Sequence, residues 1–163
     1  MPVSYSHRWV IPISRESAWK LFIEAFRDSK QVRAWPHRRL SIQSSGSERG
    51  DLLHAHSHFT VTYKVGPMRV EVPCQIREWV VGSKLAYETE EDFPLQVRSE
   101  VLLEDVPAGT LCEWRGTYVP KDLRGWGLAV TLRPVFEKFF LGGLKHSLTK
   151  TSKTVRVKSQ RLK

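Results

Sequence analysis

The chain has 163 residues, of which 40% are hydrophobic, and a formal net charge of +9. This length favours one domain with a substantial core, so we expect residues 1–163 to form one domain. Stretches of roughly 20 apolar residues, which would span a membrane, do not occur, and the N-terminus does not read as a signal peptide, so we expect a cytoplasmic protein. Cys74 and Cys112 have no metal-ligand partner at close spacing, which favours buried free thiols over a disulfide or a nucleophile.

The excess positive charge belongs to the C-terminal part of the chain. Residues 1–120 contain 15 basic and 15 acidic side chains, whereas residues 121–163 contain 11 basic and two acidic ones. We interpret the stretch from about residue 150 as a basic extension of the last helix. Such a tail attracts nucleic acid or an anionic membrane, or is simply solvated next to a helix C-terminus.

The N-terminal pattern predicts a strand followed by two short helices. Residues 5–13 are rich in aromatic and β-branched side chains, which favour a strand. Ser14 is a good N-cap and Glu16 suits the first turn of the helix that follows. A second short helix is expected at residues 29–34, ending before Trp35 because a residue that precedes a proline resists helical angles.

From residue 40 onward, apolar and polar residues alternate with the period of two that is typical of strands. Such rows predict an antiparallel sheet with one packed and one wet face. Glycine and proline turns separate the strands. We expect strands at about residues 40–42, 53–63, 68–76, 84–89, 95–103 and 110–118.

Residues 125–158 carry the pattern of a long amphipathic helix. Pro134 predicts that the main helix starts there or kinks there, because proline lacks an amide hydrogen and clashes one turn back. Gly142 and Gly143 favour a bend or close packing, or a floor on which a ligand approaches the helix. The apolar face comprises Leu128, Leu132, Val135, Phe136, Phe139, Phe140, Leu144 and Leu148.

Three segments stand out along the chain: residues 11–22 (IPISRESAWKLF), the Trp35-Pro36 pair, and residues 109–120 (GTLCEWRGTYVP). They resemble the START-like superfamily, also called Bet v 1-like and related to polyketide cyclases and dehydrases. The resemblance covers nearly the whole chain. It implies an α+β helix-grip fold, in which a curved antiparallel sheet of about six to seven strands wraps around a long C-terminal helix, with two short helices after the first strand.

The resemblance also implies a hydrophobic cavity between the sheet and the C-terminal helix. Related proteins use this cavity for lipids, sterols and polyketide intermediates. The alternative for this chain is that the same residues simply fill a core. Strand parity and the helix pattern select as ligand-binding candidates Val70, Val72, Tyr87, Val97, Ser99, Trp114, Tyr118, Phe136, Phe140, Gly143 and Leu144.

The sequence HAHSH places three histidines at alternate positions of the expected second strand. Two imidazoles that are neighbours on one strand face are close enough to share a zinc ion, whereas the outer pair would lie roughly 13 Å apart. Their face is opposite to the apolar row that includes Phe59 and Val61. We therefore expect His54, His56 and His58 to face solvent, and we predict no metal site.

The sequence leaves three functions open and contains no phosphate-binding loop, nucleophile elbow or zinc-protease motif. The first is binding of a hydrophobic small molecule (lipid, polyketide or isoprenoid-like) as a carrier or sensor, without a cofactor. The second is a cyclase-like or dehydrase-like enzyme that uses polar cavity groups from Ser99, Tyr87, Tyr118 and His7. The third is docking on nucleic acid or anionic lipid through Lys145, Lys150, Lys153, Arg156, Lys158, Arg161 and Lys163.

Overall fold

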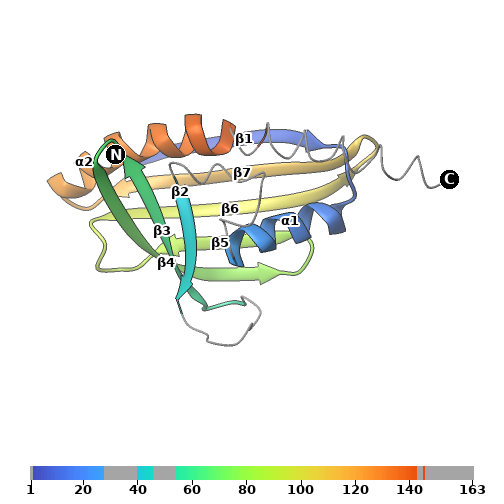
Figure 1. Ribbon diagram of the computed structural model, residues 1–163, viewed down its shortest axis with the longest axis horizontal. Helices are drawn as coiled ribbons and strands as arrows, with labels where there is room; N and C mark the ends of the chain where they lie inside the picture. Colours follow the sequence, from blue (N-terminus) through green and yellow to red (C-terminus); the bar gives the residue numbers. More distant parts are fainter. Residues whose placement is uncertain (1, 28–39, 46–53, 143–144, 146–163) are drawn as a thin grey trace.

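The computed structural model describes residues 2–27, 40–45, 54–142 and 145 (Figure 1). Within them, seven antiparallel strands form one sheet, in the order β1-β7-β6-β5-β4-β3-β2. The strands are β1 (Val3–Ile11), β2 (Leu40–Ser45), β3 (His58–Val65), β4 (Met68–Val80), β5 (Lys84–Thr89), β6 (Leu95–Val106) and β7 (Gly109–Pro120). The helices are α1 (Arg15–Arg27), α2 (Leu123–Pro134) and the π-helix η1 (Val135–Leu141).

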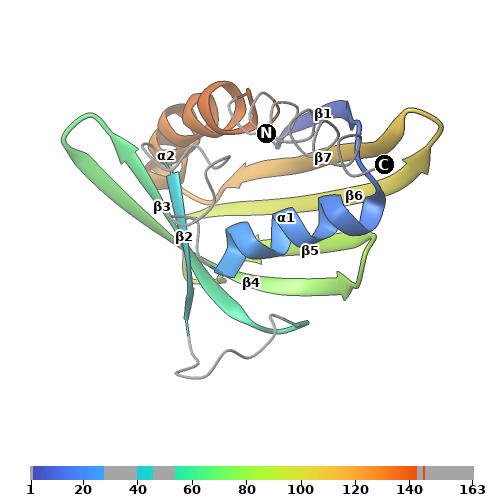
Figure 2. The ribbon, with the colours of Figure 1, turned by 45° about the vertical axis from the view of Figure 1, so that its right-hand side comes forward.

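The sheet is an antiparallel meander from β2 to β7, with β1 added at the edge beside β7. Each strand from β2 to β6 pairs with the next strand along the chain, and β1 pairs with β7, where Tyr5 lies opposite Gly116. A register shift in β4 between Ile76 and Glu78 marks a bulge, which increases local bending. The sheet is strongly curved, and α1 crosses its inner face (Figure 2). This arrangement confirms the expected helix-grip fold.

The first helix begins as the sequence predicts. The Ser14 hydroxyl oxygen accepts a hydrogen bond from the Ser17 amide at 3.3 Å, which caps the helix. Ala18, Trp19 and Phe22 are buried on its inner side. The second short helix that we expected at residues 29–34 lies outside the described residues.

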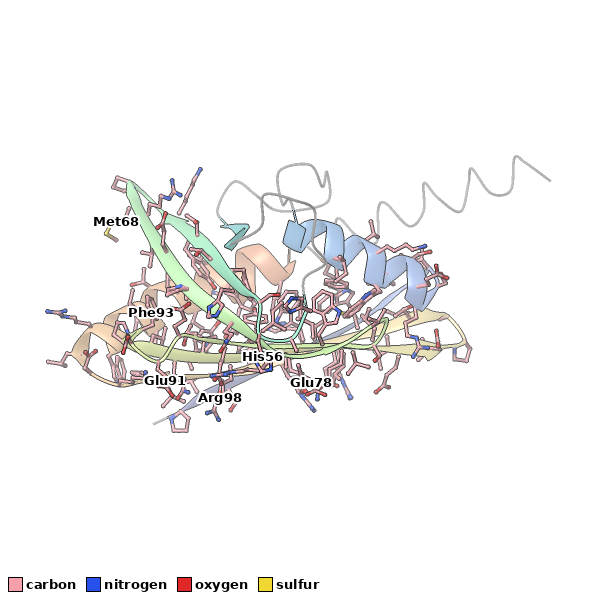
Figure 3. The ribbon with its side chains drawn as sticks, turned by 90° about the horizontal axis from the view of Figure 1, so that it is seen from below. His56, Met68, Glu78, Glu91, Phe93 and Arg98 are labelled. Carbon is pink, nitrogen blue, oxygen red and sulfur yellow. The ribbon has the colours of Figure 1, made fainter. Side chains whose placement is uncertain are left out.

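The alternation along the strands is confirmed, with apolar side chains inward and charged ones outward. Glu78 and Arg98 project from the face of the sheet that is turned away from α1 (Figure 3). On this outer face, Glu88 pairs with Arg77 and with Arg98 across neighbouring strands. Ion pairs at the surface add little stability, but their charged groups keep this face of the sheet hydrated.

The second expected strand starts later than predicted, and the prediction that three histidines share a strand face is wrong. His56 has a φ of 71°, a left-handed conformation that an extended strand excludes. The Ser57 amide donates to the His54 carbonyl at 3.1 Å, which closes a turn ahead of β3. Only His58 belongs to the strand.

The C-terminal helix begins at Leu123, well before Pro134. The Asp122 carboxylate accepts from the Gly125 amide at 2.7 Å and caps it. After Pro134 the α-helix continues as a π-helix, so the disturbance that proline causes is a change of helical geometry rather than a start. Gly142 is exposed, and a Cβ there would meet no atom within 4 Å, so the expected close packing is wrong at this glycine.

Both helices meet the sheet at one tryptophan. Trp114 on β7 is fully buried, and its ring contacts Phe22 of α1 at a centroid distance of 6.1 Å and Phe136 of η1 at 5.6 Å. Both contacts are edge-to-face, a favourable aromatic geometry. The helices therefore pack on the same face of the sheet, with Trp114 between them.

Two glycines of α2 offer a matched test of how this helix is seated. A Cβ at Gly125 would overlap the Pro94 carbonyl oxygen, whereas a Cβ at Gly127 would meet nothing within 4 Å. Gly125→Ala should destabilise the protein by about 1–3 kcal/mol through overpacking. Gly127→Ala should stabilise it by up to about 1 kcal/mol through helix propensity. Urea unfolding of both variants measures the difference, and equal effects would contradict this seating.

Candidate functional site

A narrow cavity lies between the inner face of the sheet and η1. Its volume is about 10 Å³ when measured as space for the centre of a water-sized sphere, which is room for about one water molecule. The side chains around it are mostly apolar or aromatic. They are Val61, Tyr63, Val72, Cys74, Tyr87, Thr89, Val97, Ser99, Tyr118 and Phe136.

The structure places part of the predicted site at this cavity. The candidates that line it are Val72, Tyr87, Val97, Ser99, Tyr118 and Phe136. Val70 is half-buried and packs against the core, and Trp114 fills the space between the helices, so neither lines the cavity. The side chain of Phe140, together with Gly143 and Leu144, lies outside the described residues.

Four lining residues escaped the sequence analysis: Val61, Tyr63, Cys74 and Thr89. The strand register places them at the cavity, because Val61 lies opposite Val72 and Cys74 lies opposite Thr89. Thr89 follows Tyr87 by two positions and therefore shares its face, a signal that the sequence did contain. Cys74 likewise follows Val72 by two positions on β4, whereas Val61 and Tyr63 required knowledge of which strands are neighbours.

Tyr5 is a further residue of the site that sequence reasoning did not select. It lies opposite Gly116, which in turn lies opposite Ser99 on β6. The ring of Tyr5 crosses this glycine, and its hydroxyl is 2.6 Å from the Ser99 hydroxyl. A Cβ at Gly116 would lie 2.6 Å from the Tyr5 oxygen. The glycine is therefore what allows three strands to be bridged by one hydrogen bond.

Tyr118 supplies a polar group that the described residues leave unused. Its hydroxyl is buried and has no hydrogen-bond partner within the described part of the chain. The ring is 2% exposed and lies 5.3 Å from the Tyr5 ring. An unsatisfied buried hydroxyl costs about 1–3 kcal/mol. The cavity lining thus includes a buried hydroxyl that has no partner among the described residues.

The ionisable groups around the cavity keep their protons at neutral pH. Burial raises the pKa of Tyr5, Tyr63, Tyr87 and Tyr118 above the ordinary value for tyrosine, since a phenolate would lose its hydration. Burial likewise raises the pKa of the Cys74 thiol. These side chains can form hydrogen bonds but provide neither a base nor a thiolate.

His7 does not line the cavity. It is 39% exposed, and its Nε2 lies 3.7 Å from a carboxylate oxygen of Glu137 on η1. The other oxygen of Glu137 accepts from the Arg133 guanidinium at 2.6 Å. These contacts attach η1 to β1 beside the cavity.

The three histidines of the HAHSH sequence are exposed, as expected. Nδ1 of His58 lies 2.9 Å from a carboxylate oxygen of Glu90, on the outer side of the molecule. Among the described residues, no three His, Cys, Asp or Glu side chains are grouped closely enough to hold a metal ion.

A larger hollow of about 590 Å³ lies on the outer face of the sheet, open to solvent. Three arginines and three glutamates border it, and Arg115 with Glu100 forms one of the pairs between them. Because the charges of the arginines are matched by those of the glutamates, this surface has no net preference for an anion or a cation. The inner cavity is the better candidate site.

No protein-family model matches the chain, and no curated protein has a similar sequence. Solved structures do match. Ara h 8.0201 is 14% identical, with a TM-score of 0.65 over 94% of this chain and 99% of that one. An uncharacterised protein from Rhizobium leguminosarum is 12% identical, with a TM-score of 0.64 over 92% and 96%. Protein NE0264 from Nitrosomonas europaea is 10% identical, with a TM-score of 0.64 over 95% and 97%.

These similarities extend over nearly the full length of both chains in each comparison, while the sequences have diverged far. Ara h 8 belongs to the Bet v 1 family. The chain therefore has a Bet v 1-like helix-grip fold, as the resemblance of its sequence implied. At identities of 10–14% the similarity shows the fold and does not identify a ligand.

Burial of the tyrosines and thiols predicts a loss of stability at high pH. Both kinds of side chain have a raised pKa in the folded state, and the ordinary pKa is 9.0 for cysteine and 10.0 for tyrosine. Their contribution to the stability of the fold is therefore fully present below these values and is lost as the pH rises beyond them. Each group should lower the free energy of unfolding by about 1.4 kcal/mol per pH unit in that range. Urea unfolding between about pH 8 and pH 11 measures this slope.

The same burial gives a spectroscopic control. All four tyrosines of the sequence are buried, so the absorbance of tyrosinate should appear only together with unfolding. A tyrosinate signal that develops while the protein stays folded, followed by circular dichroism, would contradict the burial of this cluster.

Proposed function

We propose that the protein binds a small, largely apolar molecule with one hydrogen-bonding group in the cavity beneath η1, as a carrier or sensor. The observation that carries this proposal is the buried Tyr118 hydroxyl, which has no partner among the described residues. A ligand carbonyl or hydroxyl that bonds to it removes the cost of that unsatisfied group. Compact isoprenoid-like or polyketide-like molecules with a single oxygen fit this description.

Entry of such a ligand requires a side chain to move, because the cavity has room for about one water molecule. Phe136 is the residue of η1 that lines the cavity, and we refer to it as the roof of the cavity. A π-helix has less favourable geometry than an α-helix and is often found at functional sites. We infer that displacement of Phe136 with η1 opens the cavity.

The chemistry of the cavity favours binding over catalysis. Proton abstraction needs a group whose pKa lies near the working pH. Burial moves the pKa of Tyr5 and of Tyr118 away from that range, and Ser99 is hydrogen-bonded to Tyr5. We propose a cytoplasmic location, in keeping with the two free thiols.

Replacement of Tyr118 by phenylalanine tests the hydrogen bond. The probe is a fluorescent naphthalene ketone, compared with the same naphthalene in which the ketone is reduced to a methylene. Tyr118→Phe should weaken ketone binding up to about tenfold, as expected for one lost hydrogen bond, and leave hydrocarbon binding unchanged. Fluorescence titration measures both affinities.

The unliganded variant provides the control. Removal of an unsatisfied buried hydroxyl should leave the protein as stable as before, or more stable by about 1 kcal/mol. A clear loss of stability in Tyr118→Phe would show that the hydroxyl already has a partner in the protein. Equal loss of affinity for both probes would mean that the hydroxyl does not contact the ketone.

Two phenylalanines on either side of Trp114 test the roof. Phe22 and Phe136 are both 3% exposed, but only Phe136 lines the cavity. Each change to alanine should cost about 3–5 kcal/mol of stability. Phe136→Ala should in addition bind the naphthalene ketone more tightly, because the roof no longer has to move, while Phe22→Ala should not. The same affinity in both variants would place the ligand elsewhere.

A further inference from the structure

The outer side of α2 presents large apolar side chains to solvent. Leu123 is 90% exposed, and Trp126 and Val130 are each 60% exposed. Their spacing of three and four residues places them on one side of the helix. Gly125 and Leu132 are the buried residues of the opposite side. Exposed apolar side chains that are grouped on one face are typical of surfaces that bind another protein or a membrane.

The helical segment that carries this face has an excess of basic residues, and an exposed acidic turn at Glu90, Glu91 and Asp92 lies beside its start, where the Lys121 ammonium donates to the Glu91 carbonyl. Lys121, Arg124 and Lys138 are exposed. The two acidic residues of the same segment are both engaged, since Asp122 caps the helix and Glu137 pairs with Arg133. The face therefore combines an apolar stripe with a basic border.

We propose that the exposed face of α2 docks the protein on an anionic lipid membrane. Tryptophan is favoured at the boundary between headgroups and acyl chains, because its ring is amphipathic. Leucine and valine beside it gain free energy by leaving water, and the basic border is attracted to anionic headgroups. Because none of the described helices is long and apolar enough to cross a bilayer, α2 lies in the surface.

Other occupants fit these features less well. A second copy of the chain on the same face would bring two basic borders together, and the residues that follow Lys145 carry six Lys or Arg and no acidic residue. Nucleic acid would satisfy the charges but would leave Leu123 and Val130 without an apolar partner. An anionic membrane satisfies both the apolar stripe and the charges.

The position of α2 gives membrane docking a consequence for the cavity. α2 continues directly into η1, which carries Phe136 over the cavity. A membrane bound at α2 thus lies at the start of the helical segment that forms the roof. Docking does not require that the cavity bind a ligand, so the two proposals can fail separately.

Vesicle flotation of the full chain tests the docking face. Vesicles of phosphatidylglycerol and phosphatidylcholine in equal parts should bind the protein, and pure phosphatidylcholine vesicles should bind it much less. The double variant Leu123→Gln and Trp126→Gln keeps the net charge and should weaken binding about tenfold or more. Val81→Gln, which changes an exposed valine in the turn between β4 and β5, is the matched control and should bind normally.

A second measurement locates the contact. Brominated phosphatidylcholine in the anionic vesicles should quench tryptophan fluorescence in the native chain. Trp126→Phe should still bind, because phenylalanine remains apolar, but should lose most of the quenching. Retained binding together with lost quenching in Trp126→Phe distinguishes insertion of α2 from attraction through the basic tail alone.

Three results would overturn the proposal. One is unchanged vesicle binding by the double glutamine variant, which would assign binding to the tail. Another is equal binding to neutral and anionic vesicles, which would exclude recognition of anionic lipid. The third is a dimer in sedimentation that the double variant abolishes, without any vesicle binding, which would make a second copy the occupant.

Discussion

The packing of Trp114 between two helices is the contact on which the rest of the structure depends. The indole is fully buried, with Phe22 of α1 on one side and Phe136 of η1 on the other. These three rings come from the N-terminal helix, the last strand and the C-terminal helix, so one cluster joins parts of the chain that are far apart in sequence. Large aromatic rings bury enough apolar area to hold such distant segments together. The position of η1 over the sheet, and so the cavity, follows from this cluster.

A second constraint sets the character of the cavity. Tyr5 crosses Gly116 and reaches the Ser99 hydroxyl at 2.6 Å, so one potential polar pair is satisfied within the protein. Tyr118 lies beside Tyr5 but has no partner for its hydroxyl among the described residues. The difference between these two neighbouring tyrosines makes the site selective, because only one of them has a hydrogen bond to offer. In the function that we propose, a ligand is recognised by one polar atom within a mainly apolar enclosure.

The C-terminal helical segment presents two different surfaces, one to the cavity and one to solvent. The inner side of η1 closes the cavity through Phe136, whereas the outer side of α2 exposes Leu123 and Trp126 within a basic border. A helix that buries one side against a sheet normally turns polar residues to water. The apolar outer side of α2 departs from this pattern, and this departure is the observation behind the proposed membrane docking. Taken together, the two proposals imply that an apolar ligand reaches the cavity from a lipid surface rather than from water.

The sequence by itself determined the features that depend on local patterns. Alternation of apolar residues predicted the strands, Ser14 predicted the start of α1, and the two cysteines were expected to be buried free thiols, which they are. These signals are local because side-chain direction and helix capping depend on residues only a few positions apart. The cavity candidates were predicted only in part, since parity selects a face of a strand but does not say which strands are neighbours.

The tertiary structure alone decided the rest. The positive φ of His56 ended the predicted long strand, because backbone hydrogen bonds between the turn and β4 override the local alternation. The narrowness of the cavity and the unsatisfied Tyr118 hydroxyl depend on how side chains from the sheet and η1 fill a shared space. The exposure of Trp126 depends in the same way on which side of α2 meets the sheet. Such properties arise from contacts between residues distant in sequence, and local patterns carry no record of those contacts.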